Sequence, residues 1–314
     1  MRSESTPPAP GGTVEGEPAA SGDPAAASIH NIGYRSYEGP RLGRAYARRS
    51  LFAQSLRGAY GLGRSAKSKM PPMILFGVMC LPALVLVAVA ITTDANELPL
   101  GYSEYALWML PLIGLFIAST APQSVSRDLR FHTVPLYFSR PIERLDYVLA
   151  KYAAMAGAIL LFTAVPLLIL YAGSLLAKLG FADQSRGVAL GLLSVVVFSV
   201  LHAGIGLVVA ALTPRRGFGV AAIIAVLTIP YFAVTALQTI AYQEGETAVV
   251  GWLGLFSPGS LMSGVQSKFL DGPSDFIGQV VPSDAAGACY LLVTAALIVG
   301  SHFALMLRYR KAGL

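Results

Sequence analysis

The sequence predicts an all-α membrane protein, and three observations support this class. Of its 314 residues, 54% are hydrophobic and only 13% are charged, with a mean hydropathy of +0.61. Soluble domains carry about 25% charged residues. The chain also contains six apolar runs, each long enough for the roughly 20 residues that a helix needs to cross a bilayer. Lys and Arg gather in alternate segments between those runs, as they do in multi-pass proteins.

The composition argues against other classes. The formal net charge of +6 would suit a nucleic-acid-binding protein, but the basic residues flank apolar runs instead of forming one patch, so we expect no nucleic-acid partner. The two cysteines, Cys80 and Cys289, both lie within apolar runs. They provide neither a disulfide framework nor a CxxC metal site, and we expect them to be packing residues.

Residues 1–40 are predicted to be a disordered cytoplasmic tail and linker. Residues 1–28 are rich in Pro, Ala, Gly, Ser and Glu and hold too little apolar surface to offset the entropy of ordering. No apolar stretch follows Arg2, so the segment does not have the pattern of a secretory signal peptide. For residues 29–40, docking on a neighbouring protein and a loose linker are both open interpretations.

Residues 41–69 are predicted to form a basic amphipathic helix at the cytoplasmic face of the membrane. Apolar residues recur there at helical spacing, and arginines occupy the other faces. The arginine stems can snorkel while their guanidinium groups lie near anionic head groups. A solvated helix packed on protein is the alternative. The two sets are Leu42, Ala45, Tyr46, Phe52, Ala53, Leu56 and Tyr60, and Arg41, Arg44, Arg48 and Arg57.

Residues 61–68, GLGRSAKS, come close to the pattern of a phosphate-binding loop, with Ala66 where the second Gly belongs. Such a loop works between a strand and a helix N-terminus, where its amides surround phosphates. Here the segment leads into Pro71, Pro72 and an apolar run. We therefore do not expect ATP to bind at this segment.

The six apolar runs are expected to be membrane spans within one domain, residues 41–314. The predicted spans are 73–93, 102–122, 147–173, 188–213, 218–242 and 285–307. Arg and Lys are concentrated before the first span, in the second and fourth loops and in the tail, whereas acids dominate the other loops. The positive-inside rule therefore places both termini in the cytoplasm.

The spans hold almost no ionisable side chains, which disfavours a proton- or sodium-coupled carrier. His202, within the fourth span, is expected to be a neutral packing residue, because no acid lies near it in sequence. Pro82, Pro111, Pro166 and Pro230 each remove a backbone donor, so kinks are expected near them.

Residues 126–144, between the second and third spans, are the candidate functional segment. Thr133 can cap a short cytoplasmic helix, Pro135 fits its first turn, and Pro141 ends it. The aromatic side of such a helix would suit a groove on another protein. An ordinary basic loop with its aromatics at the lipid interface is the alternative. The candidate interface residues are Arg127, Asp128, Arg130, Thr133, Pro135, Tyr137, Phe138, Arg140, Pro141 and Arg144.

This segment resembles the signature region of type-2 ABC exporter permeases. That region commonly has a Ser-Arg-acid start, a Thr-Leu pair, a Leu-Leu-Ser-Arg-Pro run, and then Arg and Gly-Lys at the third span. The matching residues are Ser126, Arg127, Asp128, Thr133, Val134, Ser139, Arg140, Pro141, Arg144 and Lys151. The sequence departs from the pattern at Asp128, where glutamate is usual, at His132, where glycine often occurs, and at Ala150, where glycine is usual. The interfacial helix, six spans and long last outer loop extend the resemblance over residues 41–314.

The resemblance implies a permease subunit of an ATP-driven exporter in the cell membrane. Two permeases, identical or homologous, would pair with two ATP-binding subunits, which would hold ATP and Mg and perform hydrolysis. This chain would be neither an enzyme nor a cofactor-binding protein. A coupling helix between spans 2 and 3 would enter a cleft of the ATP-binding subunit. The apolar spans suit an amphiphilic substrate such as a drug or lipid.

The resemblance also implies that residues 243–284 form short helices dipping into the outer leaflet. Trp252, Phe256 and Pro258 are the candidate outer gate, and a surface-lying amphipathic loop is the alternative. For the whole chain, the main alternative function is a non-transporting membrane scaffold or assembly subunit that recruits a cytoplasmic partner.

Overall fold

The computed structural model describes residues 39, 42–63, 65–93, 97–131, 137, 142–213 and 215–312. Helices and short connections make up these residues, and no strand occurs among them. By its contacts the chain divides into two units, Met1–Arg41 and Leu42–Leu314. Except for Gly39, the tail for which we predict disorder lies outside the described residues. The fold below is that of the second unit.

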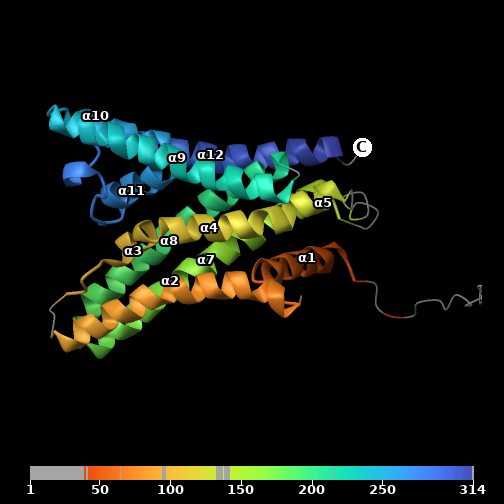
Figure 1. The fold of residues 1–314 in the computed structure, drawn as a ribbon, viewed down its shortest axis with the longest axis horizontal. Helices are drawn as coiled ribbons and strands as arrows, with labels where there is room; N and C mark the ends of the chain where they lie inside the picture. Colours follow the sequence, from red (N-terminus) through yellow and green to blue (C-terminus); the bar gives the residue numbers. More distant parts are fainter. Residues whose placement is uncertain are drawn as a thin grey trace, which may run out of the picture. The chain divides into compact units, whose positions relative to one another are not determined.

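Most of the unit consists of long helices that run alongside one another (Figure 1). In chain order the helices are α1 (Arg44–Ala59), α2 (Ala66–Thr92), α3 (Tyr102–Trp108), α4 (Leu110–Ala121), the π-helix η1 (Pro122–Ser126), α5 (Arg127–Arg130), α7 (Arg144–Leu176), α8 (Phe181–Leu212), α9 (Arg216–Gln243), α10 (Thr247–Leu253), η2 (Gly254–Phe256), α11 (Pro258–Phe269), η3 (Ile277–Gln279) and α12 (Asp284–Ala312).

Five helices, α2, α7, α8, α9 and α12, are long and apolar enough to cross a membrane. Their outward faces expose large apolar side chains, for example Leu84 on α2, Phe232 on α9 and Phe303 on α12. In water such faces would be costly, at about 25 cal/mol for each Å² of apolar surface, whereas hydrocarbon accepts them. This is the architecture of an all-α, multi-pass membrane protein.

The predicted second span is a bent pair of helices. α3 and the segment from Leu110 to Arg130 meet at 58° around Met109. Pro111 lies in the first turn of α4, where its missing N–H is no loss because the first amides of a helix have no intrahelical acceptor. The kink that we predicted near Pro111 is therefore present, as a break between two helices.

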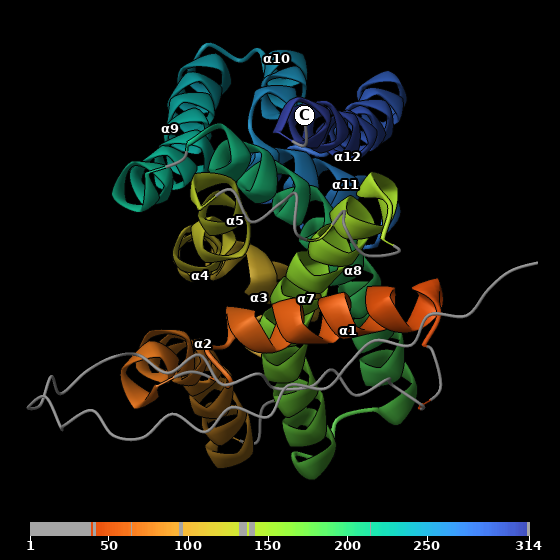
Figure 2. The ribbon, with the colours of Figure 1, turned by 90° about the vertical axis from the view of Figure 1, so that its right-hand side faces the viewer.

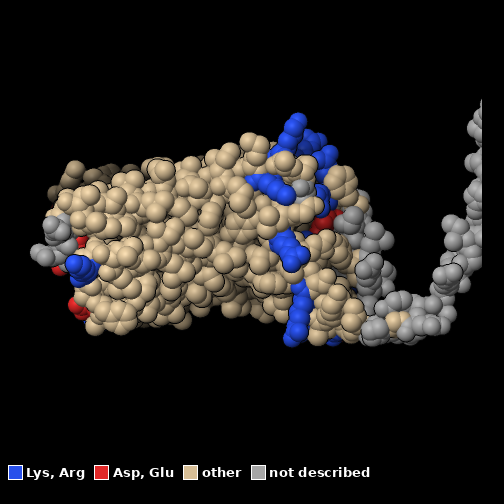
Figure 3. All heavy atoms as spheres, turned by 90° about the horizontal axis from the view of Figure 1, so that it is seen from below, with Lys and Arg blue, Asp and Glu red and all other residues tan. Residues whose placement is uncertain are grey.

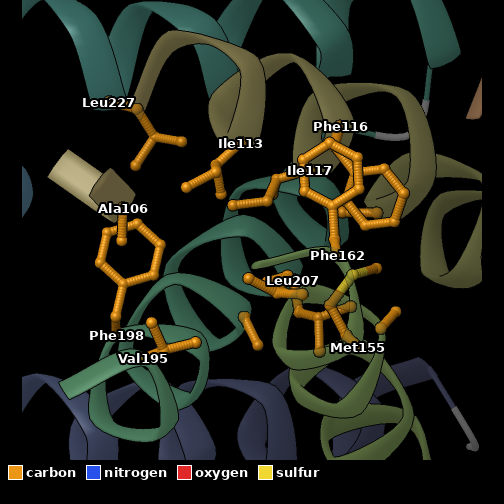
Figure 4. Close-up of a cluster of buried hydrophobic side chains, with 14 of the residues drawn as sticks. Ala106, Ile113, Phe116, Ile117, Met155, Phe162, Val195, Phe198, Leu207 and Leu227 are labelled. Atoms are coloured by element: carbon orange, nitrogen blue, oxygen red, sulfur yellow. The ribbon is translucent and has the colours of Figure 1, made fainter. Parts of the chain in front are cut away.

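The core lies where α4, α7 and α8 meet. We compared the buried share of one apolar 18-residue stretch in each of the five long helices. It is 56% in α7 and 61% in α8, against 17% in α2, 17% in α9 and 22% in α12, so α7 and α8 are the central helices. Phe116 of α4 stacks on Phe162 of α7 with ring centroids 4.4 Å apart (Figure 4). On α8, a Cβ added to Gly204 would lie 2.2 Å from Ser301 Oγ, so glycine permits the close approach of α12.

The N-terminal helix is shorter than predicted. α1 ends at Ala59 instead of continuing to residue 69, and the last residues of the predicted range belong to the first turn of α2. Gly61 follows α1 at φ +68°, and a Cβ there would lie 2.4 Å from Ser68 O, so the chain must turn at a glycine. α1 lies across α7 (Figure 2), where Tyr60 donates a hydrogen bond to Ala158 O at 2.7 Å.

Charged side chains are segregated between the two ends of the helical unit. Lys and Arg form a band near one end of the face seen in Figure 3. We call this the basic end; it comprises α1, α5, the start of α7 and the end of α12. At the opposite end, Arg186 pairs with Asp271 at 3.0 Å and Lys268 pairs with Asp284 at 2.6 Å. These two cations are thus compensated by acids, in contrast to the surplus of cations at the basic end.

Candidate functional site

The candidate site is the connection between α4 and α7 at the basic end. Of its predicted residues, Arg127, Asp128, Arg130, Tyr137 and Arg144 are among the described residues. Thr133, Pro135, Phe138, Arg140 and Pro141, and with them the predicted coupling helix, lie outside the described residues.

The first side of the connection leaves the bundle through a π-helix. In η1, the extra residue per turn widens the helix directly after α4. Ser126, at its end, is buried and donates a hydrogen bond to Ala210 O of α8 at 2.7 Å. α8 thereby fixes the position from which α5 begins. Arg308 of α12 donates to the next carbonyl of α8, Ala211 O, at 3.1 Å.

A buried ion pair joins the two sides of the connection. Asp128 of α5 is only 7% exposed, and its Oδ2 lies 3.0 Å from Lys151 Nζ of α7. The same oxygen accepts a hydrogen bond from the Tyr147 hydroxyl at 2.6 Å. Lys151 also donates to Ser124 O of η1 at 3.0 Å. Several hydrogen bonds thus compensate a carboxylate and an ammonium group that are withdrawn from water.

Aromatic rings pack together beside this ion pair. The ring of Tyr147 lies edge-on to that of Tyr309 from α12, with centroids 4.9 Å apart. Tyr137, from the connection itself, lies 5.3 Å from Tyr147 between ring centroids. Lys151 Nζ is 5.5 Å from the centroid of the Tyr147 ring. The start of α7, the end of α12 and the connection therefore meet around one aromatic residue, Tyr147.

The sequence pattern alone did not identify this cluster. Asp128 was predicted to face a partner protein, but its side chain is turned into the protein. In the sequence, Lys151 is one match to a family pattern, and no motif marks Tyr147 or Tyr309. The available signal was Lys151 inside the predicted third span, because a buried lysine requires an anionic partner. Arg127 and Arg130, in contrast, are exposed, and their contact with a partner stays a prediction.

The other side of the connection is fastened to α1. Arg44 of α1 forms ion pairs with Glu143 and with Asp146, and Arg48 Nη1 lies 3.5 Å from Asp146 Oδ1. The Asp146 side chain is 2% exposed, whereas that of Glu143 is 65% exposed. Two of the arginines expected near lipid head groups, Arg44 and Arg48, thus pair with acids at the start of α7. α1 packs on protein along this face, and its position at the membrane interface stays a prediction.

An apolar cavity of about 580 Å³ lies between α3, α4 and α9. Trp108, Gly114 and Leu227 are among the residues that line it, and Tyr231 and Asp275 add its polar groups. The Tyr231 hydroxyl donates to Asp275 Oδ2 at 3.2 Å. Although Asp275 is accessible to solvent, partial desolvation by its surroundings raises the pKa of its carboxyl group above the ordinary 3.8.

The predicted outer gate lies in a helical hairpin between α9 and α12. α10, η2 and α11 return into the bundle, and α11 is largely buried. The hydroxyl of Tyr290 in α12 donates to Gly251 O of α10 at 2.7 Å. Short helices therefore occur here, as the first of our two alternatives required. Trp252 and Phe256 are exposed, and Pro258 is the first residue of α11; their role as a gate stays a prediction.

Metal-binding geometry is not found in the described part of the chain. No three His, Cys, Asp or Glu residues lie close enough there to hold an ion. His202 is buried, its ring stacks on that of Phe198 at 3.9 Å, and its Nδ1 lies 3.0 Å from Phe198 O. This environment is that of a packing histidine. Cys80 and Cys289 are free thiols.

The arrangement at the basic end is suited to a mechanical role. Both sides of the connection are fixed to central helices by buried polar contacts, and exposed arginines surround it. A force applied to the connection would therefore act on α4 and α7 together.

No protein-family model matches this chain, and no curated protein matches it.

Proposed function

We propose that this chain is the membrane-spanning permease subunit of an ATP-driven ABC transporter, working as an exporter in the cell membrane. Residues 126–144 would couple it to a separate ATP-binding subunit. The observation that carries the proposal is the buried Asp128–Lys151 pair, which ties the two sides of this segment together at its base. A partner that grips the segment would thereby move two spans at once.

In this proposal the chain has six spans. α2, α7, α8, α9 and α12 provide five, and the bent pair of α3 and α4 provides the second span along the chain. Six crossings leave both termini on one side. The basic end would face the cytoplasm, because positively charged segments are retained there. The paired Arg186 and Lys268 at the opposite end are consistent with this orientation, since acids compensate their charge.

The energy would come from ATP that is bound with Mg by the partner subunit. Closure of that subunit on ATP can shift the permease between inward- and outward-facing states only if it interacts differently with the two states. The π-helix η1 is a suitable place for such a change, because one hydrogen-bond register shift there alters the direction of α5. A second permease, a copy or a homologue, would complete the pathway.

The substrate would be an amphiphile. The apolar cavity between α4 and α9 has the volume and lining of a small-molecule site, with Tyr231 and Asp275 as its polar end. An amphiphile whose polar or cationic part faces Asp275 would match this distribution. The described residues that line this cavity do not include Asp128 or Lys151, so binding and coupling would occur at separate places.

Affinity purification from the native host tests the proposal. The full chain would be extracted in mild detergent, and the co-purifying proteins would be identified and assayed for ATPase activity. Wild type is expected to retain an ATP-binding subunit, and the double variant Phe138→Ala, Arg140→Glu is expected to lose it while remaining in the membrane. The matched control is Phe181→Ala, Arg186→Glu, which alters an exposed aromatic residue and an exposed arginine at the opposite end.

The outcomes separate the two candidate functions. Loss of the ATPase from the first double variant and its retention in the control would support coupling through the segment. Recovery of a partner without ATPase activity would favour the scaffold. An ATPase that binds all three proteins equally would refute the proposed interface.

A further inference from the structure

A second cavity, polar and cationic, lies at the basic end, where η1 and α5 face the turn between α1 and α2. It measures about 530 Å³ and is enclosed by the turn between α1 and α2, the end of α4, η1 and α5. Three cationic side chains line it, namely Lys67, Arg127 and Arg130. None of the described residues that line it is Asp or Glu. Because the charged side chains among these lining residues are all cationic, the cavity attracts an anion.

Ser65 and Ser68 add hydroxyl groups that can donate to an anion. The hydroxyls of Ser119 and Thr120, which also line the cavity, instead donate to Phe116 O at 2.8 Å each. Within the described part of the chain, no ion pair is formed by Lys67, Arg127 or Arg130. The nearest acid in sequence, Asp128, is held by Lys151 and Tyr147 on the inner side of α5. The three cations are therefore available to a ligand.

A tight turn at Gly61 shapes this cavity. Gly61, at φ +68°, packs so closely on the backbone of Ser68 that a side chain would displace the turn. This contact brings the start of α2 against the end of α1, and Ser65, Lys67 and Ser68 line the cavity there. α2 begins at Ala66 with no acid in its first turn, so the positive end of its dipole adds to the field. The segment that only approximated a phosphate-binding loop in sequence thus lies beside two arginines.

We propose that this cavity binds a phosphate-bearing group. Arginine forks and a lysine ammonium match the several oxygens of a phosphate, and hydroxyl donors can satisfy the oxygens that remain. Two sources share this chemistry, the headgroup of an anionic lipid and a free phosphate ion. The position favours the lipid, because the exposed apolar residues Met73 and Ile74 of α2 follow directly after the cavity wall and would contact its acyl chains.

Occupancy would link the turn after α1 to α5, where the connection begins. The ligand would bridge Lys67 on one wall and Arg127 and Arg130 on the other, and so resist their separation. This inference does not depend on the proposed transport function. A chain that recruits no ATPase would still bind the ligand.

Thermal unfolding of the purified full chain in neutral detergent tests the site. Dioctanoyl phosphatidic acid, dioctanoyl phosphatidylcholine and inorganic phosphate would be titrated separately. Phosphatidic acid is expected to raise the Tm of wild type. In Lys67→Gln its half-saturating concentration should rise roughly tenfold, the loss expected for one charge-assisted hydrogen bond. Lys69→Gln, two residues away and outside the cavity lining, should behave as wild type.

The three titrations distinguish a lipid headgroup from a free phosphate ion. A shift with phosphatidic acid alone supports the lipid headgroup, and an equal shift with inorganic phosphate supports the free ion. No shift with either probe overturns the proposal. Equal shifts with phosphatidylcholine also overturn it, because the choline cation balances the phosphate of that lipid and binding would then not depend on an anionic headgroup. Equal affinities in wild type and Lys67→Gln overturn it as well, because they indicate binding at another place.

A measurement on wild type alone tests the site without depending on the folding of a variant. Acetylation by an amine-reactive reagent would be followed by mass spectrometry at Lys67 and Lys69, both of which are exposed. The ligand that raises the Tm should slow modification of Lys67 several-fold and leave Lys69 unchanged. Equal protection of both lysines, or of neither, would show that the cavity is not the site.

Discussion

Lys151 Nζ of α7 lies 3.0 Å from Asp128 Oδ2 of α5, and both side chains are at most 10% exposed. Removing either partner would leave the other charge buried, which costs about 3–5 kcal/mol. Asp128→Leu and Lys151→Met should each lower the unfolding free energy by that amount. The double variant should lose less than the sum, because no uncompensated charge remains. Denaturant unfolding of the full chain in detergent measures all three.

An exposed pair with the same separation is the control for this prediction. Arg186 and Asp271 are also 3.0 Å apart, but their side chains are 72% and 70% exposed. Asp271→Asn should change stability by about 0–1 kcal/mol, since water screens the interaction. Asn also tolerates the positive φ of this position, 54°. Equal losses at Asp128 and Asp271 would contradict our description of a buried, structural ion pair.

The attachment of α1 depends on Asp146 more than on Glu143. Asp146 is buried and forms ion pairs with both Arg44 and Arg48, whereas Glu143 is exposed and its one ion pair among the described residues is with Arg44. Asp146→Ala should therefore release α1 from the start of α7. Hydrogen exchange would detect this as amide exchange in α1 that is roughly tenfold faster than in wild type. Glu143→Ala should cause a much smaller increase, and equal effects would refute the assigned order of importance.

The sequence predicted the helices well because hydrocarbon imposes a simple requirement on them. A span must be long and apolar, so the predicted run 147–173 corresponds closely to α7, Arg144–Leu176. α7 begins slightly earlier because Glu143 and Asp146 form a capping box at its N-terminus. The angle of 58° at Met109 was not predictable in the same way, because Pro111 indicates a kink without fixing its direction.

The candidate site was predictable in its charge and not in its internal contacts. Arg127 and Arg130 had to be outside the hydrocarbon, and they are exposed. The burial of Asp128 depends on how closely α5 approaches α7, which is a property of packing between segments distant in sequence. The cationic cavity has the same origin, since it forms only where the turn after α1 meets α5.

Stability should depend on pH through Asp275. Desolvation raises the pKa of its carboxyl group in the folded protein above 3.8, so the folded state holds this proton more tightly than the unfolded state. Stability therefore falls as pH rises from about 3.8 through the folded pKa, and the cost is fully present above that value. Asp275→Asn should remove this contribution and keep an acceptor for the Tyr231 hydroxyl.

The measurement is the difference in unfolding free energy between wild type and Asp275→Asn from pH 4 to pH 7. The variant should gain stability relative to wild type as pH increases. Subtraction cancels the other titrating groups that both proteins share. Asp271→Asn, at a neighbouring exposed aspartate, controls for the loss of one charge. A difference that stays constant, or that changes in the opposite direction, would contradict the desolvation of Asp275.

Filling the apolar cavity should block transport if the amphiphile binds there. A Cβ at Gly114 would meet only Leu227 Cδ1, at 3.8 Å, so Gly114→Phe can place its ring in the cavity without displacing the backbone. Gly77 of α2 faces open space and provides the matched control, Gly77→Phe. Efflux of a lipophilic cationic dye, rhodamine 6G, would be measured in host cells that express the chain with its ATPase partner.

We expect Gly114→Phe to reduce efflux at least about tenfold, because the ring occupies the volume that the dye requires. Gly77→Phe should transport as wild type does, since its ring would lie on the outer face of α2. If Gly114→Phe were correctly inserted and transported normally, the cavity between α4 and α9 would not be part of the pathway, whereas a loss in both variants would point to impaired assembly instead.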